Sequence, residues 1–324
     1  MREVAFLKRN EKKWKDLEDG LEKRNKLTPD ELSDRYIQLT DDYAYSKTFY
    51  PDSKVTQYLN QLLSLTHSRI YRNKKENRSR IIKFWITELP NVIYEQRRFL
   101  LYSFIIFGLY VLIGAYSSSQ DKDYVRLILG DHYVNRTIEN IENGEPMAIY
   151  KGGGELNMFL GITFNNVRVS FIAFAYGVLF SLGTVIILVL NGIMLGSFQY
   201  FFYEYGYLLE SVLSIWVHGT LEISAIIIAG GAGILFGASF MFPGTYSRKY
   251  AFQKAAKDGI KIIFGLIPIF IIAGFLEGFV TRHADVVPFV AASIISVSVI
   301  FILYYFIYYP ISLNNNQPDG TNKL

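Results

Sequence analysis

The sequence predicts an all-α, polytopic helical membrane protein with about six transmembrane helices and an N-terminal cytoplasmic helical bundle. The 324-residue chain is 51% hydrophobic, and its charges are spread unevenly. Residues 1–98 hold 21 Lys or Arg and 15 Asp or Glu, whereas residues 169–247 hold no Lys or Arg at all. A water-exposed surface needs charged side chains, so a stretch of that length without a cation is expected to lie in lipid.

Residues 1–98 are expected to form a soluble domain of two or three packed helices. Apolar residues recur at helical spacing between charged ones, first at Leu7, Trp14, Leu17 and Leu21. A second helix should begin at residues 28–31, Thr-Pro-Asp-Glu, where Thr can cap, Pro takes the first helical position and Glu lies three residues after the cap. A third should carry the apolar stripe from residue 55 to residue 70.

A basic cluster precedes the first expected span. It consists of Arg69, Arg72, Lys74, Lys75, Arg78, Arg80 and Lys83. Such side chains can bind anionic headgroups, with about 1 kcal/mol for each cation near the surface, or they can form a solvated helix face. In both cases the positive-inside rule places this side of the membrane in the cytoplasm. The small net charge of +4 favours a lipid surface as the partner and not a nucleic acid.

The transmembrane domain is expected over residues 99–311. Its six spans should cover residues 99–116, 169–190, 191–207, 212–242, 262–281 and 286–309. Residues 117–157 read as an acidic extracytoplasmic loop with short helices, and residues 312–324 as a disordered cytoplasmic tail.

The main alternative topology concerns the third span. Because the basic loop at residues 243–261 should be cytoplasmic, residues 191–242 must cross the membrane an even number of times. A re-entrant hairpin over residues 191–216 is the competing topology, and it would place that basic loop outside.

Polar side chains inside the spans form a short set, and each is costly in lipid. They are Asn165, Asn166, Arg168, Asn191, His218, Glu222 and Glu277. His218 and Glu222 lie four residues apart and therefore on one helix face. The crossing directions place these two, Glu277 and residues 165–168 near the outer side, where they could meet.

Two interpretations of this polar cluster stay open. It is either a site for an ion, a proton or a partner group, or a sealed hydrogen-bond network that joins helices. A metal site is a further alternative, although the second His of an H-E-x-x-H arrangement is missing. With no Cys and no complete catalytic set, we expect no enzyme activity, no resident metal and no cofactor.

Glycines at small-xxx-small spacing predict close helix packing. The pairs are Gly192 with Gly196 and Gly233 with Gly237. Packing within one subunit is the favoured interpretation, and a homodimer face is the alternative.

Several motifs together resemble the stage II sporulation protein M family. They are Phe164-Asn165-Asn166, Gly177 with Gly183, Leu190-Asn191-Gly192 with Gly196, His218-Gly219-Thr220-Leu221-Glu222, Gly230-Gly231-Ala232-Gly233 and Leu276-Glu277-Gly278-Phe279. The N-terminal motifs Arg35-Tyr36, Asp41-Asp42, Tyr50-Pro51 and Tyr58-Leu59-Asn60 resemble the soluble extension of non-sporulation members.

The resemblance implies a multi-pass protein of the bacterial cytoplasmic membrane. Sporulation members of the family anchor peptidoglycan-degrading partners and do not hydrolyse the wall themselves. The leading hypothesis is therefore a non-enzymatic scaffold of the cell envelope that binds membrane or envelope proteins. A transporter or channel that uses the His/Glu cluster is the alternative, and an intramembrane metal-dependent hydrolase is a second one.

Overall fold

The computed structural model describes residues 3–22, 27–72, 79–148, 154–281 and 288–315, and these are helical throughout apart from short turns. The chain divides into two compact units, Met1–Ile81 and Ile82–Leu324.

The N-terminal unit contains the three helices that the sequence predicts. They are α1 (Glu3–Glu22), α2 (Pro29–Phe49) and α3 (Lys54–Arg72). The expected capping box is present at the start of α2. The Thr28 backbone N–H donates to Glu31 Oε2 at 2.8 Å, and the Glu31 N–H donates to Thr28 Oγ1 at 3.3 Å. Each residue thus satisfies a backbone donor that the helix itself leaves unpaired.

The core of this unit combines apolar burial with two aromatic hydrogen bonds. Its buried side chains are Phe6, Trp14, Leu17, Leu39, Val55, Leu59 and Leu62. Trp14 Nε1 donates to Asp42 Oδ2 at 2.8 Å, and the Tyr58 hydroxyl donates to Glu18 Oε2 at 2.9 Å. Partial burial and the neighbouring Glu18 carboxylate raise the pKa of Tyr58 to about 12. These polar contacts join α1 to α2 and to α3.

Among the described residues, six helices are long and apolar enough to cross a membrane. The first runs from α4 (Ser79–Lys83) through the π-helical turn η1 (Phe84–Glu88) into α5 (Leu89–Gln120). The next three are α8 (Glu155–Ala175), α9 (Leu182–Glu204) and α10 (Leu208–Met241). The fifth is α11 (Arg248–Phe275), extended by η4 (Leu276–Thr281). The sixth comprises α12 (Pro288–Leu303), η5 (Tyr304–Tyr308) and α13 (Tyr309–Asn315).

The expected number of spans is confirmed, but the boundary between the second and third spans was wrong. The chain turns at residues 176–181, where Phe180 and Ser181 adopt positive φ angles of 54° and 67°. It does not break at Asn191, whose side-chain amide donates to Ile187 O at 2.8 Å within α9. Both α9 and α10 are continuous and long enough to cross a membrane, which favours two crossings over a re-entrant hairpin at residues 191–216. Uniform hydropathy concealed the turn from sequence reasoning.

The first span also begins earlier than residue 99. The unit boundary lies after Ile81 and not after residue 98, because Leu89, Val92 and Ile93 belong to the buried core of the membrane unit. The Tyr305 hydroxyl donates to Trp85 O at 2.7 Å and fixes this early segment against the last span. The expected turn at residues 282–285 lies outside the described residues.

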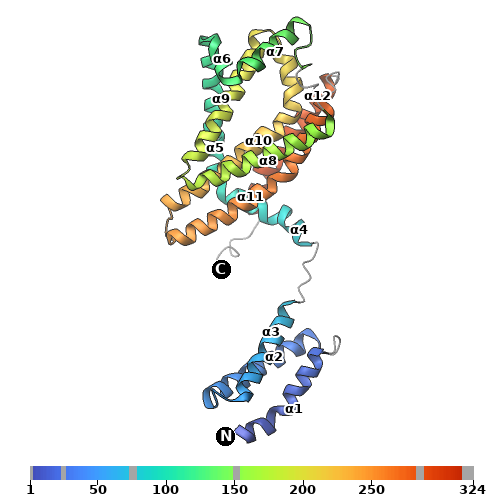
Figure 1. Ribbon diagram of the computed structural model, residues 1–324, viewed down its shortest axis with the longest axis vertical. Helices are drawn as coiled ribbons and strands as arrows, with labels where there is room; N and C mark the ends of the chain where they lie inside the picture. Colours follow the sequence, from blue (N-terminus) through green and yellow to red (C-terminus); the bar gives the residue numbers. More distant parts are fainter. Residues whose placement is uncertain (1–2, 23–26, 73–78, 149–153, 282–287, 316–324) are drawn as a thin grey trace. The chain divides into compact units, whose positions relative to one another are not determined.

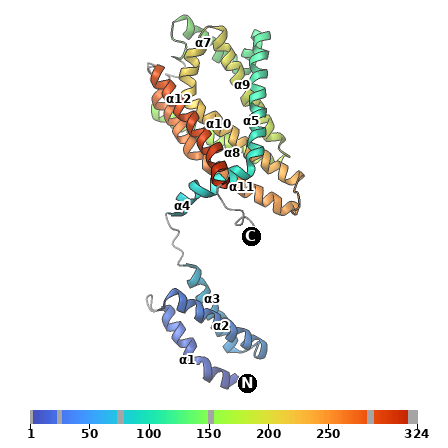
Figure 2. The same ribbon diagram turned by 180° about the vertical axis from the view of Figure 1, so that it is seen from behind.

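The polar connection after the first span folds as two short helices, α6 (Lys122–Leu129) and α7 (Asp131–Glu142). Both lie at the same end of the membrane unit as the start of α10 (Figure 1). Figure 2 shows the α10–α11 connection at the opposite end. Val125, Val134 and Met147 pack on Phe201 and Phe202 of α9. The short helices are therefore part of the membrane unit.

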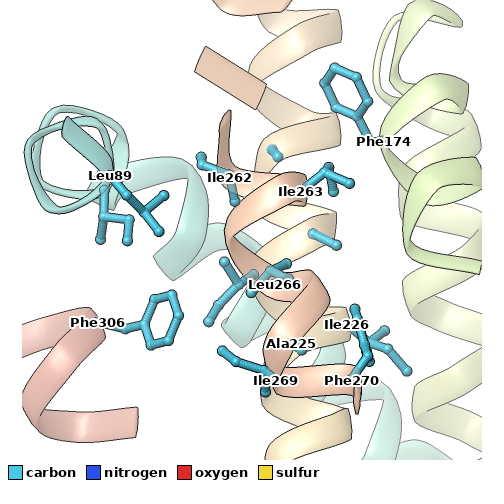
Figure 3. Close-up of a cluster of buried hydrophobic side chains, with 14 of the residues drawn as sticks. Leu89, Phe174, Ala225, Ile226, Ile262, Ile263, Leu266, Ile269, Phe270 and Phe306 are labelled. Carbon is cyan, nitrogen blue, oxygen red and sulfur yellow. The ribbon is translucent and has the colours of Figure 1, made fainter. Parts of the chain in front are cut away.

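The main core of the membrane unit forms around α11. In Figure 3, Leu266 and Ile269 lie between Phe306 and Leu89 on one side and the helix that carries Ala225 and Ile226 on the other.

Glycines let the helices approach closely, as the sequence predicts. A Cβ atom built on Gly196 would lie 2.0 Å from Val111 O of α5, and one on Gly237 would lie 2.3 Å from Gly177 O. Both predicted glycine pairs thus pack within one chain.

Candidate functional site

The candidate site starts from two side chains on α10. His218 and Glu222 are one helical turn apart and lie on the same face. His218 is buried and Glu222 is half-buried. At about 1.5 Å per residue, His218 lies about 15 Å along the helix from Leu208, well inside the apolar span.

The second part of the site is the π-helical segment η4, which continues α11. It carries Glu277 and Thr281, both buried. Glu277 Oε2 lies 3.6 Å from His218 Nε2, and Thr281 Oγ1 lies 3.1 Å from His218 Nδ1. The two ring nitrogens therefore face different partners on one segment. Single π-helical turns inside α-helices occur frequently at functional sites.

The third part comes from α8. The buried Asn166 side chain lies beside the Glu222 carboxyl group. The α8 helix packs closely on both partner helices, since a Cβ atom on Gly233 of α10 would lie 2.5 Å from Ala173 O, and one on Gly274 of α11 would lie 2.3 Å from Thr163 Oγ1. Three separate spans thus contribute to one polar group inside the helical bundle.

Three ligand-type groups from these spans lie close together. One ligand atom each from His218, Glu222 and Glu277 lies within 4.8 Å of the other two. Across the described ranges, neither glutamate forms an ion pair with a Lys or Arg side chain. Two carboxylates so placed in an apolar interior need protons or a bound cation to balance their charge. The arrangement can therefore hold and release a positively charged ion.

The structure leaves three of the expected polar residues outside this cluster. Asn165 and Arg168 are exposed on α8, because neighbouring residues of a helix point about 100° apart and only Asn166 faces α10. Asn191 bonds back to its own helix, as described above. Thr281 was not among the residues expected from the sequence. Its position four residues after Glu277 is the signal that could have identified it.

The expected basic cluster is described only in part. Lys74, Lys75 and Arg78 lie outside the described residues, as does the side chain of Arg72. Arg80 and Lys83 are exposed and Arg69 is half-buried. Lipid binding by this cluster stays a prediction.

The space beside the site is apolar. A cavity of about 410 Å³ lies between α10, α11 and α12. Leu221 and Leu276 line it, and these are the sequence neighbours of the two glutamates. The cavity supplies no charged group, so the polar chemistry of this region rests on the site itself.

Comparison with known proteins identifies the family. Residues 103–282 match the family described as Stage II sporulation protein M, which is more than half of the chain. The chain belongs to this family. The match covers every residue of the candidate site, and the family is thus defined on the membrane unit that carries the site. Residues 4–72 match a separate domain of unknown function (DUF8413), which corresponds to α1–α3.

One relative is similar to about half of the chain. An uncharacterized protein of Methanocaldococcus jannaschii is 28% identical over 157 residues, which cover 47% of this chain and 68% of the relative. No solved structure matches the chain. Family membership and the six spans together make this a multi-pass membrane protein.

Proposed function

We propose that this chain is a transporter that moves a small cation across its membrane through the site of His218, Glu222 and Glu277. The single observation that carries the proposal is the meeting of two carboxyl groups and one imidazole inside a bundle of apolar spans. Ionisable groups at such depth are expensive, and they mark ion and proton pathways in membrane proteins.

Irregular backbone near the site supports this proposal. Glu277 lies on the π-helical segment η4, and Pro268 lies inside α11 just before it. Proline removes one backbone hydrogen bond and loosens a helix locally. Interrupted helices that carry polar groups are typical of transporter binding sites. The fifth span therefore combines a weakened helix with a ligand-type side chain.

The test is a flux assay in proteoliposomes that contain the purified full-length chain. We expect cation movement by the parent, and a loss to the background of empty liposomes for Glu222→Gln and Glu277→Gln, because each removes a charge from the site. Glu210→Gln is the matched control, since Glu210 lies on the same helix but is exposed. Flux that persists in both site variants, or that is absent from the parent for every cation tried, would contradict the proposal.

A scaffold role is the second candidate, and the N-terminal unit favours it. This unit has its own buried core and its own family match, separate from the membrane unit. A module of this kind can bind a partner while the six spans anchor it. We propose a membrane or envelope protein as that partner, in the cytoplasmic membrane with both termini in the cytoplasm.

Affinity purification from gently solubilised membranes tests the scaffold role. We expect a stoichiometric partner with the full-length chain and its loss when residues 1–81 are deleted. Recovery of the full-length chain alone would count against this role. Retention of the partner by the shortened chain would assign the docking surface to the membrane unit instead.

A further inference from the structure

We propose that His218, Glu222 and Glu277 together bind one divalent transition-metal ion of the zinc class. The inference deepens the transport proposal, because it names the class of cation that the same site takes.

The distances fit a tetrahedral ion. Zinc bonds to His nitrogen and to carboxylate oxygen are about 2.0 to 2.2 Å long, so two ligand atoms on a tetrahedron lie about 3.4 Å apart. His218 Nε2 and Glu277 Oε2 are separated by 3.6 Å. The Glu222 carboxyl group completes a set within 4.8 Å, and small side-chain rotations would bring it to the same separation. Three protein ligands leave the fourth position open.

The ligand set selects the class of metal. One imidazole and two carboxylates suit Zn²⁺, Mn²⁺, Fe²⁺ and Co²⁺. Ca²⁺ requires six to eight oxygen ligands, and Cu⁺ prefers sulfur ligands. The sequence contains no Cys, so no thiolate can join this site. The charges also agree, since one divalent cation neutralises two carboxylates and leaves an apolar interior without net charge.

Two further side chains adjoin the ligands in the positions that orienting partners take at metal sites. Thr281 Oγ1 lies 3.1 Å from His218 Nδ1, which leaves Nε2 as the nitrogen that faces Glu277. Asn166 lies beside the carboxyl group of Glu222. Metal-binding His residues almost always use their second nitrogen in such a hydrogen bond, and metal-binding carboxylates are likewise hydrogen-bonded.

Metal binding by the purified full-length chain tests the inference. The chain is prepared in detergent through a tag without histidine, stripped with a chelator and dialysed against Zn²⁺ or Co²⁺. We expect one ion per chain and, with Co²⁺, the intense visible absorption of a tetrahedral site that Zn²⁺ abolishes. A monodisperse parent chain that retains no stoichiometric ion would overturn the inference without recourse to any variant.

Variants assign the ion to this site. His218→Gln, Glu222→Gln and Glu277→Gln should each abolish stoichiometric binding, whereas Glu210→Gln should bind as the parent does. Thr281→Val should weaken binding by about 10- to 100-fold, as loss of an orienting partner does. Stoichiometric binding that survives all three ligand variants would overturn the assignment. Zinc bound without flux would contradict transport alone, and flux without bound metal would contradict only the metal assignment.

Discussion

Replacement of Gly196 by alanine is expected to destabilise the membrane unit severely. A Cβ atom at this position would lie 2.0 Å from Val111 O and 2.8 Å from Ala115 N, both backbone atoms of α5. Backbone atoms cannot rotate away as the end of a side chain can, so α5 and α9 must move apart. Overpacking typically costs about 1 to 3 kcal/mol, and contact with backbone should place this substitution at or above the top of that range.

Thermal unfolding of the detergent-solubilised chain measures this effect. Gly108→Ala is the control, because Gly108 lies in α5, the helix that Gly196 of α9 contacts, and a Cβ atom there meets nothing within 4 Å. That control should equal or exceed the stability of the parent, since alanine favours the helix by up to about 1 kcal/mol over glycine. If Gly196→Ala unfolds at the temperature of the parent, the close contact between α5 and α9 is not present in the protein.

Zinc is expected to raise the thermal stability of the parent chain strongly. An ion that binds only the folded state adds about 2.7 kcal/mol when its free concentration is a hundred times the dissociation constant. The ion would bridge α10 and η4 through His218, Glu222 and Glu277, and both segments belong to the folded core. Chelation should reverse this gain in stability, because it removes the ion and with it the binding free energy that stabilises the folded state.

Two glutamate variants serve as controls for the predicted stabilisation by zinc. Glu277→Gln should lose the zinc-dependent gain, since it deletes a ligand, and Glu210→Gln should keep it, since that side chain is exposed. The measurement is the unfolding temperature with zinc and with chelator for each protein. An equal gain in all three proteins would show that zinc stabilises the chain from another place.

Local patterns were sufficient for the helices themselves. The capping box of Thr28 and Glu31 acts within one helical turn, and the spacing of His218 and Glu222 follows from helix geometry alone. The absence of Lys and Arg from residues 169–247 marked the lipid-embedded part, because lipid penalises charge whatever the packing. These features depend on neighbours in the chain and on the solvent.

The turn between the second and third spans could not be placed in the same way. Residues 176–181 are as apolar as the helices around them, so neither charge nor hydropathy marks the turn. Asn191-Gly192 looked like a break, yet Gly192 serves the contact with α5, where a Cβ atom would lie 2.8 Å from Phe107 O. A glycine that permits close packing and a glycine that ends a helix are identical in sequence.

By itself, therefore, the sequence determined the helical class, the six spans, the family motifs and the shared face of His218 and Glu222. Only the tertiary structure decided that Glu277, Thr281 and Asn166 complete the group and that Asn165 and Arg168 stay outside it. The reason is physical. Helix periodicity is set by hydrogen bonds between residues four apart, whereas the faces that meet across helices depend on how distant surfaces pack.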